Sequence, residues 1–381
     1  MPRPLRLLQL PAGSAELLTA LAGALDGTGP ALLPLPAGPA EAARLQQALR
    51  PDEPLESDDI ALIVPTSGST GEAKGVLLTA AALTASAAAT QQRLGGPGRW
   101  LLALAPTHIA GLQVLLRSLH AATDPVTLPD GPFTPAAFTA ATAQLGPGRR
   151  YTSLVPTQLR RVLAEGQSAV ALASYDAVLV GGAATPTDLL TEARAQGVRV
   201  VTTYGMSETS GGCVYDGLPL AGVTVELDDD QRIRLGGPVL ASGYRLRPDL
   251  TAQAFDRGRF TTSDLGSLDP CGRLTVLGRA DDVIVSGGEK IVPLTVELSL
   301  AAHPAIADVA VVGVPDSEWG QRVVAVVRLR DGADLTLTQV REHVAATLPR
   351  AFAPRELRLV DALPLLASGK TDRVLLAQLP A

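Results

Sequence analysis

Short apolar runs alternate with helical stretches along most of the chain. In the first fifty residues the pattern predicts helices over 14–25 and 39–49. From Ile60 to Gly237 the apolar runs are short and end in small or turn residues, which is typical of buried strands. These runs are "IALIVP", "RWLLALAP", "SLVP", "AVLVGGA" and "VRVVTTYG", with helices between them such as 186–195. We therefore expect a layered α/β domain whose ligand loops lie at the carboxyl ends of its strands.

The pattern differs in the last third of the chain. The segments "GVTVEL" and "QRIRLGG" alternate with period two, which predicts an antiparallel module. After "LGRADD" we expect a small α+β unit with helices at about 295–302 and 337–348 and strands at "DVAVVGV" and "RVVAVVRL". No internal repeat is visible. We place the boundary near Ala280–Asp281, which gives an N-terminal domain of residues 1–280 and a C-terminal domain of residues 281–381.

The stretch "TSGSTGEAKGV", residues 66–76, looks suited to phosphate because it combines glycines, hydroxyl side chains and a lysine. It is not a P-loop, because Lys74 follows Ala73 instead of the glycine that such a loop requires. The neighbouring runs "IALIVP" and "GVLLT" both predict strands, and the next helix begins only after Thr79, a good N-cap. The loop is therefore expected to join strand to strand, whereas a P-loop leads into a helix.

Composition narrows the class of protein. Apolar residues make up 46% and charged residues 18%, which suits a compact enzyme. The net charge of −6 argues against nucleic acid as a partner, and two cysteines cannot form a disulfide framework, which suits the cytoplasm. The start of the chain lacks the apolar core of a signal peptide, and the most apolar windows are interrupted by polar residues and proline, so no stable membrane insertion is expected. The sequence leaves the oligomeric state open, and a homo-oligomer is among the alternatives.

Lysine is rare, which draws attention to its positions. Only three of the 32 basic residues are lysines, and each lies in a glycine-containing segment: Lys74, Lys290 and Lys370. A lysine is a compact, rotatable point charge that reaches a single phosphate oxygen better than the planar arginine does. We take Lys74 and Lys370 as candidate functional residues and assign no role to Lys290.

Five motifs occur in one order: "TSGSTGEAKGV", "TYGMSET", "TTSDLG", "GRADDVIVSGGEKI" and "SGKTDR". In order and approximate spacing they resemble the acyl-adenylate-forming enzymes, from about residue 60 to the C-terminus. The resemblance implies a large layered α/β N-terminal domain, here shortened, and a small mobile α+β C-terminal domain. Within that superfamily, "LLALAPTHIAGLQVLLRSL" and "SLVPTQLRRVL" are most similar to o-succinylbenzoate–CoA ligases of menaquinone biosynthesis.

The resemblance assigns roles to the N-terminal motifs. The glycine loop would wrap the ATP phosphates, with Lys74 adding charge. In "TYGMSET", Tyr204 would stack on adenine, Ser207 would touch phosphate, and Glu208 would hold Mg²⁺, which prefers oxygen ligands, with Gly205 as a further nucleotide-binding residue. The further nucleotide-binding residues implied are Thr66, Ser67, Gly68, Ser69, Thr70 and Gly71 of the loop, with Gly182 and Ala183 of "GGAAT".

The later motifs would serve the ribose and the second half of the reaction. Asp264 would accept both ribose hydroxyls and Arg279 would make the second ribose contact. Ser263 stands where the family has glycine, so we expect a slight effect on nucleotide affinity. The hinge would lie at Asp281. The CoA tunnel would be bordered by Gly287 and Gly288, and Lys370 would swing onto the reacting carboxylate and the α-phosphate.

The sequence thus predicts an AMP-forming acyl-CoA ligase that uses ATP, Mg²⁺ and CoA. An aryl carboxylate, o-succinylbenzoate above all, would form an acyl-adenylate and then a CoA thioester. Three alternatives stay open: a ligase for another aryl or short acyl acid, a stand-alone adenylation domain that loads a carrier protein, and a nucleotide-binding remnant without activity.

Overall fold

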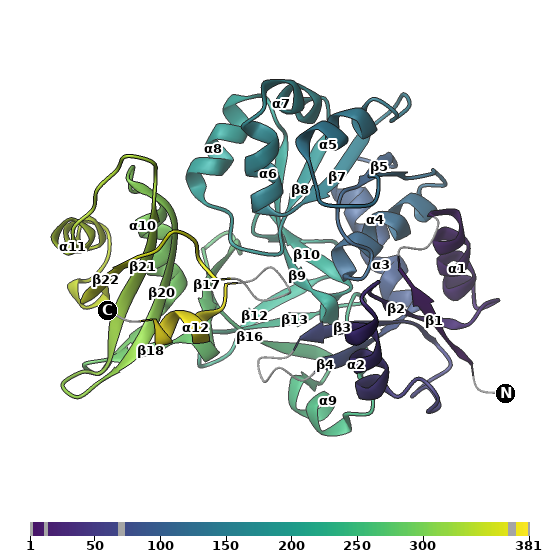
Figure 1. Ribbon diagram of the computed structural model, residues 1–381. Helices are drawn as coiled ribbons and strands as arrows, with labels where there is room; N and C mark the ends of the chain where they lie inside the picture. The colour runs from purple at the N-terminus through teal and green to yellow at the C-terminus, as the bar shows by residue number, and fades with distance from the viewer. Residues whose placement is uncertain (1–2, 11–13, 68–72, 365–370, 380–381) are drawn as a thin grey trace.

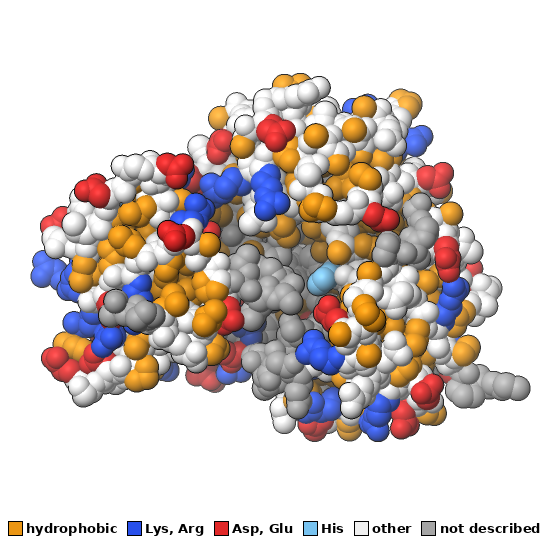
Figure 2. All heavy atoms as spheres, in the orientation of Figure 1, with side chains coloured by type: hydrophobic (Ala, Val, Ile, Leu, Met, Phe, Trp, Pro, Cys, Tyr) orange, Lys and Arg blue, Asp and Glu red, His pale blue; other side chains and the backbone are white. Residues whose placement is uncertain are grey.

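The computed structural model describes residues 3–10, 14–67, 73–364 and 371–379. Figure 1 shows the N-terminal elements at the right and a separate C-terminal unit at the left. In Figure 2 acidic and basic side chains are interspersed over the visible face, with apolar side chains between them. Within the described residues, no helix has both the length and the apolar character needed to cross a membrane.

The first sheet carries the strands on either side of the glycine loop. Its first three strands are parallel and its last two are antiparallel to their neighbours. In spatial order they are β1 (Leu5–Gln9), β2 (Ala31–Leu35), β3 (Ile60–Ser67), β4 (Ala73–Thr79) and β14 (Gly243–Tyr244). The loop therefore joins strand to strand, as predicted. Helices α1 (Ser14–Asp26) and α2 (Pro39–Leu49) also match the prediction, whereas β1 and β2 were not predicted.

The predicted N-cap at Thr79 is confirmed. Its hydroxyl accepts a hydrogen bond from the Ala82 N–H at 3.1 Å and starts helix α3 (Ala80–Arg93). The cap ends β4 sharply, so this strand of the glycine loop and the helix that follows it are joined without a linker.

The second sheet has seven strands in a mostly parallel arrangement. Their spatial order is β11 (Leu218–Pro219), β10 (Gly211–Tyr215), β9 (Val200–Met206), β8 (Ala177–Val180), β7 (Arg150–Leu154), β5 (Arg99–Leu102) and β6 (Val126–Thr127). Every residue of β8 is buried, because both faces of the sheet are covered. The covering helices are α3, α4 (Ile109–His120), α5 (Pro135–Thr142), α6 (Pro156–Leu163), α7 (Gly166–Ala173) and α8 (Thr187–Ala195).

An antiparallel module follows, as the period-two segments predicted. It consists of β12 (Thr224–Leu227), β13 (Arg232–Gly236), β16 (Arg259–Leu268), β15 (Phe255–Asp256) and β17 (Leu274–Arg279), with the short helix α9 (Pro248–Ala254) between β14 and β15. Strand β16 pairs with β17 so that Asp264 lies opposite Arg279.

The C-terminal unit begins at the 3₁₀ turn η2 (Ala280–Asp282). Its sheet has the order β19 (Glu289–Ile291), β18 (Ile284–Ser286), β21 (Gly320–Leu329) and β20 (Ile306–Asp316), and β22 (Glu356–Leu359) also pairs with β21. Its helices are α10 (Pro293–Ala301), α11 (Leu337–Ala345) and α12 (Arg373–Gln378), with a further 3₁₀ turn η3 (Arg350–Phe352). Among the described residues, no hydrophobic core cluster contains side chains from both sides of residue 280. The two parts therefore bury separate cores.

Candidate active site

The glycine loop is presented by two paired strands. Thr66 on β3 lies opposite Lys74 on β4, and its hydroxyl reaches the Lys74 carbonyl at 3.4 Å. Ser67 is the last residue of β3. Gly68, Ser69, Thr70 and Gly71 lie outside the described residues. The half-buried Lys74 side chain places its Nζ 5.6 Å from the centre of the Tyr244 ring, within the range of a cation–π contact.

Glu208 lies beside this lysine although it comes from the other sheet. It sits in the 3₁₀ turn η1 (Ser207–Thr209), directly after β9, and Ser207 before it is buried. The Tyr244 hydroxyl donates a hydrogen bond to Glu208 Oε1 at 2.9 Å. Burial raises the pKa of Glu208, although hydrogen bonds, including that from Tyr244, and the charge of Lys74 act in the opposite direction. Since burial disfavours the ionised form of Glu208, a cation beside the carboxylate stabilises its negative charge.

Tyr204 and Asp264 meet across two sheets. The Tyr204 hydroxyl on β9 donates to Asp264 Oδ2 on β16 at 2.8 Å, and Arg279 NH1 lies 3.6 Å from Asp264 Oδ1. Burial, followed by the negative charge of Asp264, raises the pKa of Tyr204, so the phenol stays protonated and remains a donor. Ser263 lies within β16 and has no positive φ, so this departure from the family's glycine does not strain the backbone. Asp264 and Arg279, the two predicted ribose-binding residues, thus lie side by side.

The "GGAAT" loop follows β8 and lies next to the start of the "TYGMSET" motif. A Cβ atom at Gly181 would fall 2.2 Å from the Thr203 hydroxyl, so only glycine allows this approach of the two segments. Gly182 has φ +79° and is exposed, as is Ala183. At Gly205 a Cβ atom would meet the Gly211 carbonyl at 2.2 Å, so glycine is needed there for β10 to return along β9.

The candidate residues of the C-terminal unit are more exposed. Asp281 in η2 accepts a hydrogen bond from Arg279 at 2.8 Å, so the predicted hinge is tied to a predicted ribose contact. Gly287 and Gly288 form the exposed turn between β18 and β19, with φ of +59° and +85°. This turn by itself requires glycine. Lys370 lies outside the described residues.

Glu208 has the properties of a ligand for a hard cation such as Mg²⁺. Among the described residues there is no group of three or more His, Cys, Asp or Glu side chains that could enclose a metal. Mg²⁺ needs no such enclosure, because it keeps several waters and commonly binds through one carboxylate together with substrate phosphates. The half-buried Glu208, next to the strand that follows the glycine loop, matches that donor set.

Two family models match this chain. The model for "AMP-binding enzyme" matches residues 16–256, and that for "AMP-binding enzyme C-terminal domain" matches residues 295–370. The chain belongs to the AMP-binding enzyme family. The predictions of the superfamily, of the α/β fold with a small C-terminal unit and of an AMP-forming acyl-CoA ligase are confirmed.

Two curated relatives of this AMP-binding enzyme share a name. A "Probable 2-succinylbenzoate--CoA ligase" of Mycobacterium tuberculosis is 50% identical over 98% of both chains. A "2-succinylbenzoate--CoA ligase" of Geobacillus sp. is 34% identical over 84% of this chain and 69% of its own length. Among solved structures, the o-succinylbenzoate CoA synthetase of Bacillus subtilis in complex with its acyl-adenylate intermediate has a TM-score of 0.78 and 27% identity, covering 99% of this chain and 83% of that one.

A solved ATP complex adds support for the fold. MatB of Rhodopseudomonas palustris has a TM-score of 0.82 at 22% identity and covers 99% of this chain and 96% of that one. At this identity the likeness concerns the fold alone.

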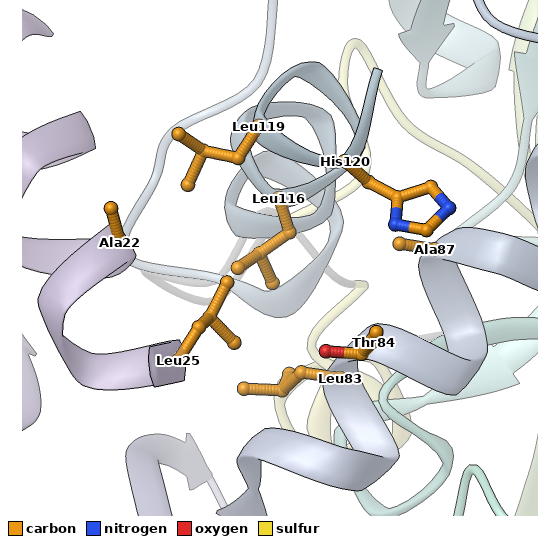
Figure 3. Close-up of a pocket in the computed structure, with 8 residues that line it drawn as sticks. All are labelled: Ala22, Leu25, Leu83, Thr84, Ala87, Leu116, Leu119 and His120. Atoms are coloured by element: carbon orange, nitrogen blue, oxygen red, sulfur yellow. The ribbon is translucent and has the colours of Figure 1, made fainter. Parts of the chain in front are cut away.

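A pocket elsewhere on the molecule does not suit a nucleotide. It has a volume of about 240 Å³ and lies between α1, α3 and α4 (Figure 3). Its lining is mostly aliphatic: Ala22, Leu25, Leu83, Thr84, Ala87, Leu116, Leu119 and His120. It contains none of the predicted site residues and offers little to bind a triphosphate.

Two residues of the site region were missed by sequence reasoning. Tyr244 joins Lys74 to Glu208, and Arg245 beside it has a fully buried side chain that binds the connector before β3. The only signal in the sequence is the Gly-Tyr-Arg run itself, whose glycine, Gly243, has φ +147° in the structure. That signal marks a special backbone and does not reveal the partners.

Proposed function

We propose that this AMP-forming ligase converts 2-succinylbenzoate, ATP and CoA to 2-succinylbenzoyl-CoA, AMP and pyrophosphate. The observation that carries the proposal is that Lys74 and Glu208 share Tyr244, that Tyr204 binds Asp264, and that the charges of Lys74 and Asp264 both act on Glu208. The name of a relative that is 50% identical over nearly the whole chain supports the choice of acid. We also propose that the enzyme acts in the cytoplasm.

The nucleotide would bind through residues that are already paired. Asp264 accepts the ribose hydroxyls, and Tyr204 fixes its Oδ2 by hydrogen bonding while Arg279 lies beside Oδ1. Residues 66–71 and Lys74 receive the phosphates. Glu208 would hold Mg²⁺, which when bound offsets negative charge on the phosphate oxygens. The carboxylate of the acid can then approach the α-phosphate of ATP with less electrostatic repulsion.

The reaction has two steps. A carboxylate oxygen of the acid attacks the α-phosphorus, and the bond to pyrophosphate breaks. The CoA thiol sulfur then attacks the acyl carbonyl, AMP leaves, and the thiol proton passes to solvent. In the first step Lys370 would offset the repulsion between carboxylate and phosphate, and it would withdraw when the C-terminal domain rotates.

We propose that this rotation occurs about Asp281, with domains of residues 1–280 and 281–381. The separate hydrophobic cores on the two sides of residue 280 support this boundary. The two family models, which match residues 16–256 and 295–370, also lie on opposite sides of it. The turn at Gly287 and Gly288 would border the CoA tunnel after rotation.

The test is pyrophosphate release from ATP with a panel of carboxylic acids, each with and without CoA. We expect release with 2-succinylbenzoate and a CoA thioester only when CoA is present. Release with another aryl or short acyl acid in preference would change the substrate. Release with an amino acid and no CoA product would indicate a carrier-loading adenylation domain. No release with any acid would overturn the ligase.

A further inference from the structure

Tyr244 contacts both charged residues that flank the proposed phosphate site. It is 7% exposed and its hydroxyl donates to Glu208 Oε1 at 2.9 Å. The Lys74 ammonium lies 5.6 Å from the centre of its ring. The ring also packs edge-on against Phe255, with centroids 5.8 Å apart. One side chain therefore gives a hydrogen bond to the carboxylate and a cation–π surface to the lysine.

The strand pairing explains how the lysine reaches the ring. Tyr244 pairs with Val76 in the antiparallel ladder between β14 and β4. Side chains alternate along a strand, so Lys74 projects to the same face of β4 as Val76 and can reach its neighbour across the ladder. The residues just before Tyr244 also contact the backbone of Glu208, because the Ala241 N–H donates a hydrogen bond to the Glu208 carbonyl at 2.8 Å.

The backbone on both sides of Tyr244 is fixed. The Tyr244 N–H donates to the Thr251 hydroxyl at 2.9 Å, and the Arg245 N–H donates to the Gly75 carbonyl at 2.7 Å. The Arg245 guanidinium is fully buried and is held by the carbonyls of Leu49, Arg50, Glu53 and Pro54 and by the Glu56 carboxylate. Because these contacts fix the backbone on both sides of Tyr244, its side chain has little freedom to follow a moving partner. It therefore holds Glu208 and Lys74 in place.

We propose that Tyr244 is a positioning residue that holds the Glu208 carboxylate and the Lys74 ammonium in fixed places relative to each other. The hydroxyl occupies one carboxylate oxygen, Oε1, and so sets the direction of the other. The ring holds the ammonium near the start of the glycine loop. Outer partners of a metal-binding carboxylate act in this way, and their loss commonly weakens metal binding about 10- to 100-fold. The inference rests on the proposed function, because it takes Glu208 as the residue for Mg²⁺.

The test separates the hydroxyl from the ring. Tyr244→Phe keeps the ring beneath Lys74 and removes the bond to Glu208, whereas Tyr244→Leu removes both. Binding of α,β-methylene-ATP is measured by calorimetry in Mg²⁺ and in EDTA, together with the Mg²⁺ concentration that half-saturates pyrophosphate release. The matched control is Tyr175→Phe, which also loses the hydrogen bond of a fully buried tyrosine, to Thr142, but in the core beneath α5.

For Tyr244→Phe we expect about a tenfold rise in the half-saturating Mg²⁺ concentration and a similar loss of Mg²⁺-dependent binding, with binding in EDTA unchanged. For Tyr244→Leu we expect binding in EDTA to weaken as well, about two- to fivefold, because Lys74 loses its cation–π contact. Tyr175→Phe is expected to match the wild type in both conditions.

Two results would overturn the inference. One is a Tyr244→Phe variant that matches the wild type in its Mg²⁺ dependence. The other is an equal loss of binding in Mg²⁺ and EDTA, which is the result of a packing role alone. Failure of the proposed function looks different, because the wild type itself would then show no Mg²⁺-dependent binding of the analogue and no release of pyrophosphate.

Discussion

The N-terminal part and the C-terminal unit hold their candidate residues in contrasting ways. In the N-terminal part Tyr204, Glu208 and Asp264 are partly buried, and each is fixed by a hydrogen bond to another site residue. In the C-terminal unit Gly287 and Gly288 lie in an exposed turn. The proposed nucleotide-binding residues are therefore already held in place without a ligand, whereas the proposed CoA-binding turn lies on the surface.

This difference fits a two-step ligase. Charges that stabilise phosphate must be in place in advance, since a fixed dipole or charge costs no reorganisation during the reaction. In the proposed mechanism, groups that serve one step and then withdraw belong to the C-terminal unit, and its separate hydrophobic core suits such a movement. Arg279 connects the two parts, because it lies near both Asp264 and Asp281.

The largest effect is expected at Lys370. Lys370→Ala should slow adenylation about 10²- to 10³-fold, because the repulsion between carboxylate and phosphate is no longer offset. Transfer from a preformed acyl-adenylate to CoA should stay near the wild-type rate. The two half-reactions are measured separately, with Arg328→Ala, a surface change on β21, as the control. An equal loss in both half-reactions would contradict the assignment of Lys370 to the adenylation step alone.

A second large effect is expected in the N-terminal part. Glu208→Gln keeps an acceptor for Tyr244 but removes the charge, so adenylation should fall about 10²-fold and respond less to Mg²⁺. The rate of pyrophosphate release is measured against Mg²⁺ concentration. Glu226→Gln, which removes an exposed partner of Arg259, serves as the control. If the dependence of the rate on Mg²⁺ concentration is unchanged, Glu208 does not bind the metal.

A smaller effect is expected at the hinge. Asp281→Pro restricts φ at η2 and should slow thioester formation about tenfold while adenylation continues. Asp281→Ala removes the same ion pair to Arg279 without fixing φ and should have less effect on the second step. Both half-reactions are followed in single turnover. If the proline variant loses adenylation instead, the boundary between the two parts lies elsewhere.

The smallest effect is a pH dependence confined to the C-terminal unit. His303 and His343 pack edge to face with ring centres 5.0 Å apart, and burial, followed by the neighbouring His343, lowers the pKa of His303 below 6.5. The unfolded chain then binds a proton more readily, so stability is kept above about pH 6.5 and is lost as the pH falls below it.

The unfolding of this unit is followed by the fluorescence of Trp319 at pH 7.5 and 5.5. His303→Gln should reduce the difference between the two pH values, whereas His120→Gln, an exposed change on α4, should not. A His303→Gln variant with the wild-type pH dependence would place the titrating group elsewhere.

Local patterns made much of the fold predictable. The hairpin of β3 and β4, the cap at Thr79 and the buried run of β8 follow from neighbouring residues, so sequence periodicity predicted them. Strand β2 was missed because "ALLPL" contains a proline, which normally argues against a strand between two others. The motif residues were predicted from the family resemblance, and the structure brings Tyr204 to Asp264 and Lys74 to Glu208 through Tyr244.

The remainder depended on contacts far apart in the sequence. Arg245 binds the carbonyl of Leu49, 196 positions away, and Tyr244 binds Glu208, 36 positions away. The strand that carries Tyr244 has only two residues, too few to show any periodicity. Such residues acquire a role only once the sheets are assembled, so no local pattern could have indicated them.

The most direct test of the account is an ordered single-turnover experiment. The enzyme is mixed with ATP, Mg²⁺ and 2-succinylbenzoate, and CoA is added only after pyrophosphate has been measured. The account predicts about one pyrophosphate per active site and a bound acyl-adenylate before CoA, followed by thioester and AMP after it. Formation of ADP and phosphate, or release of pyrophosphate only after CoA is added, would contradict it.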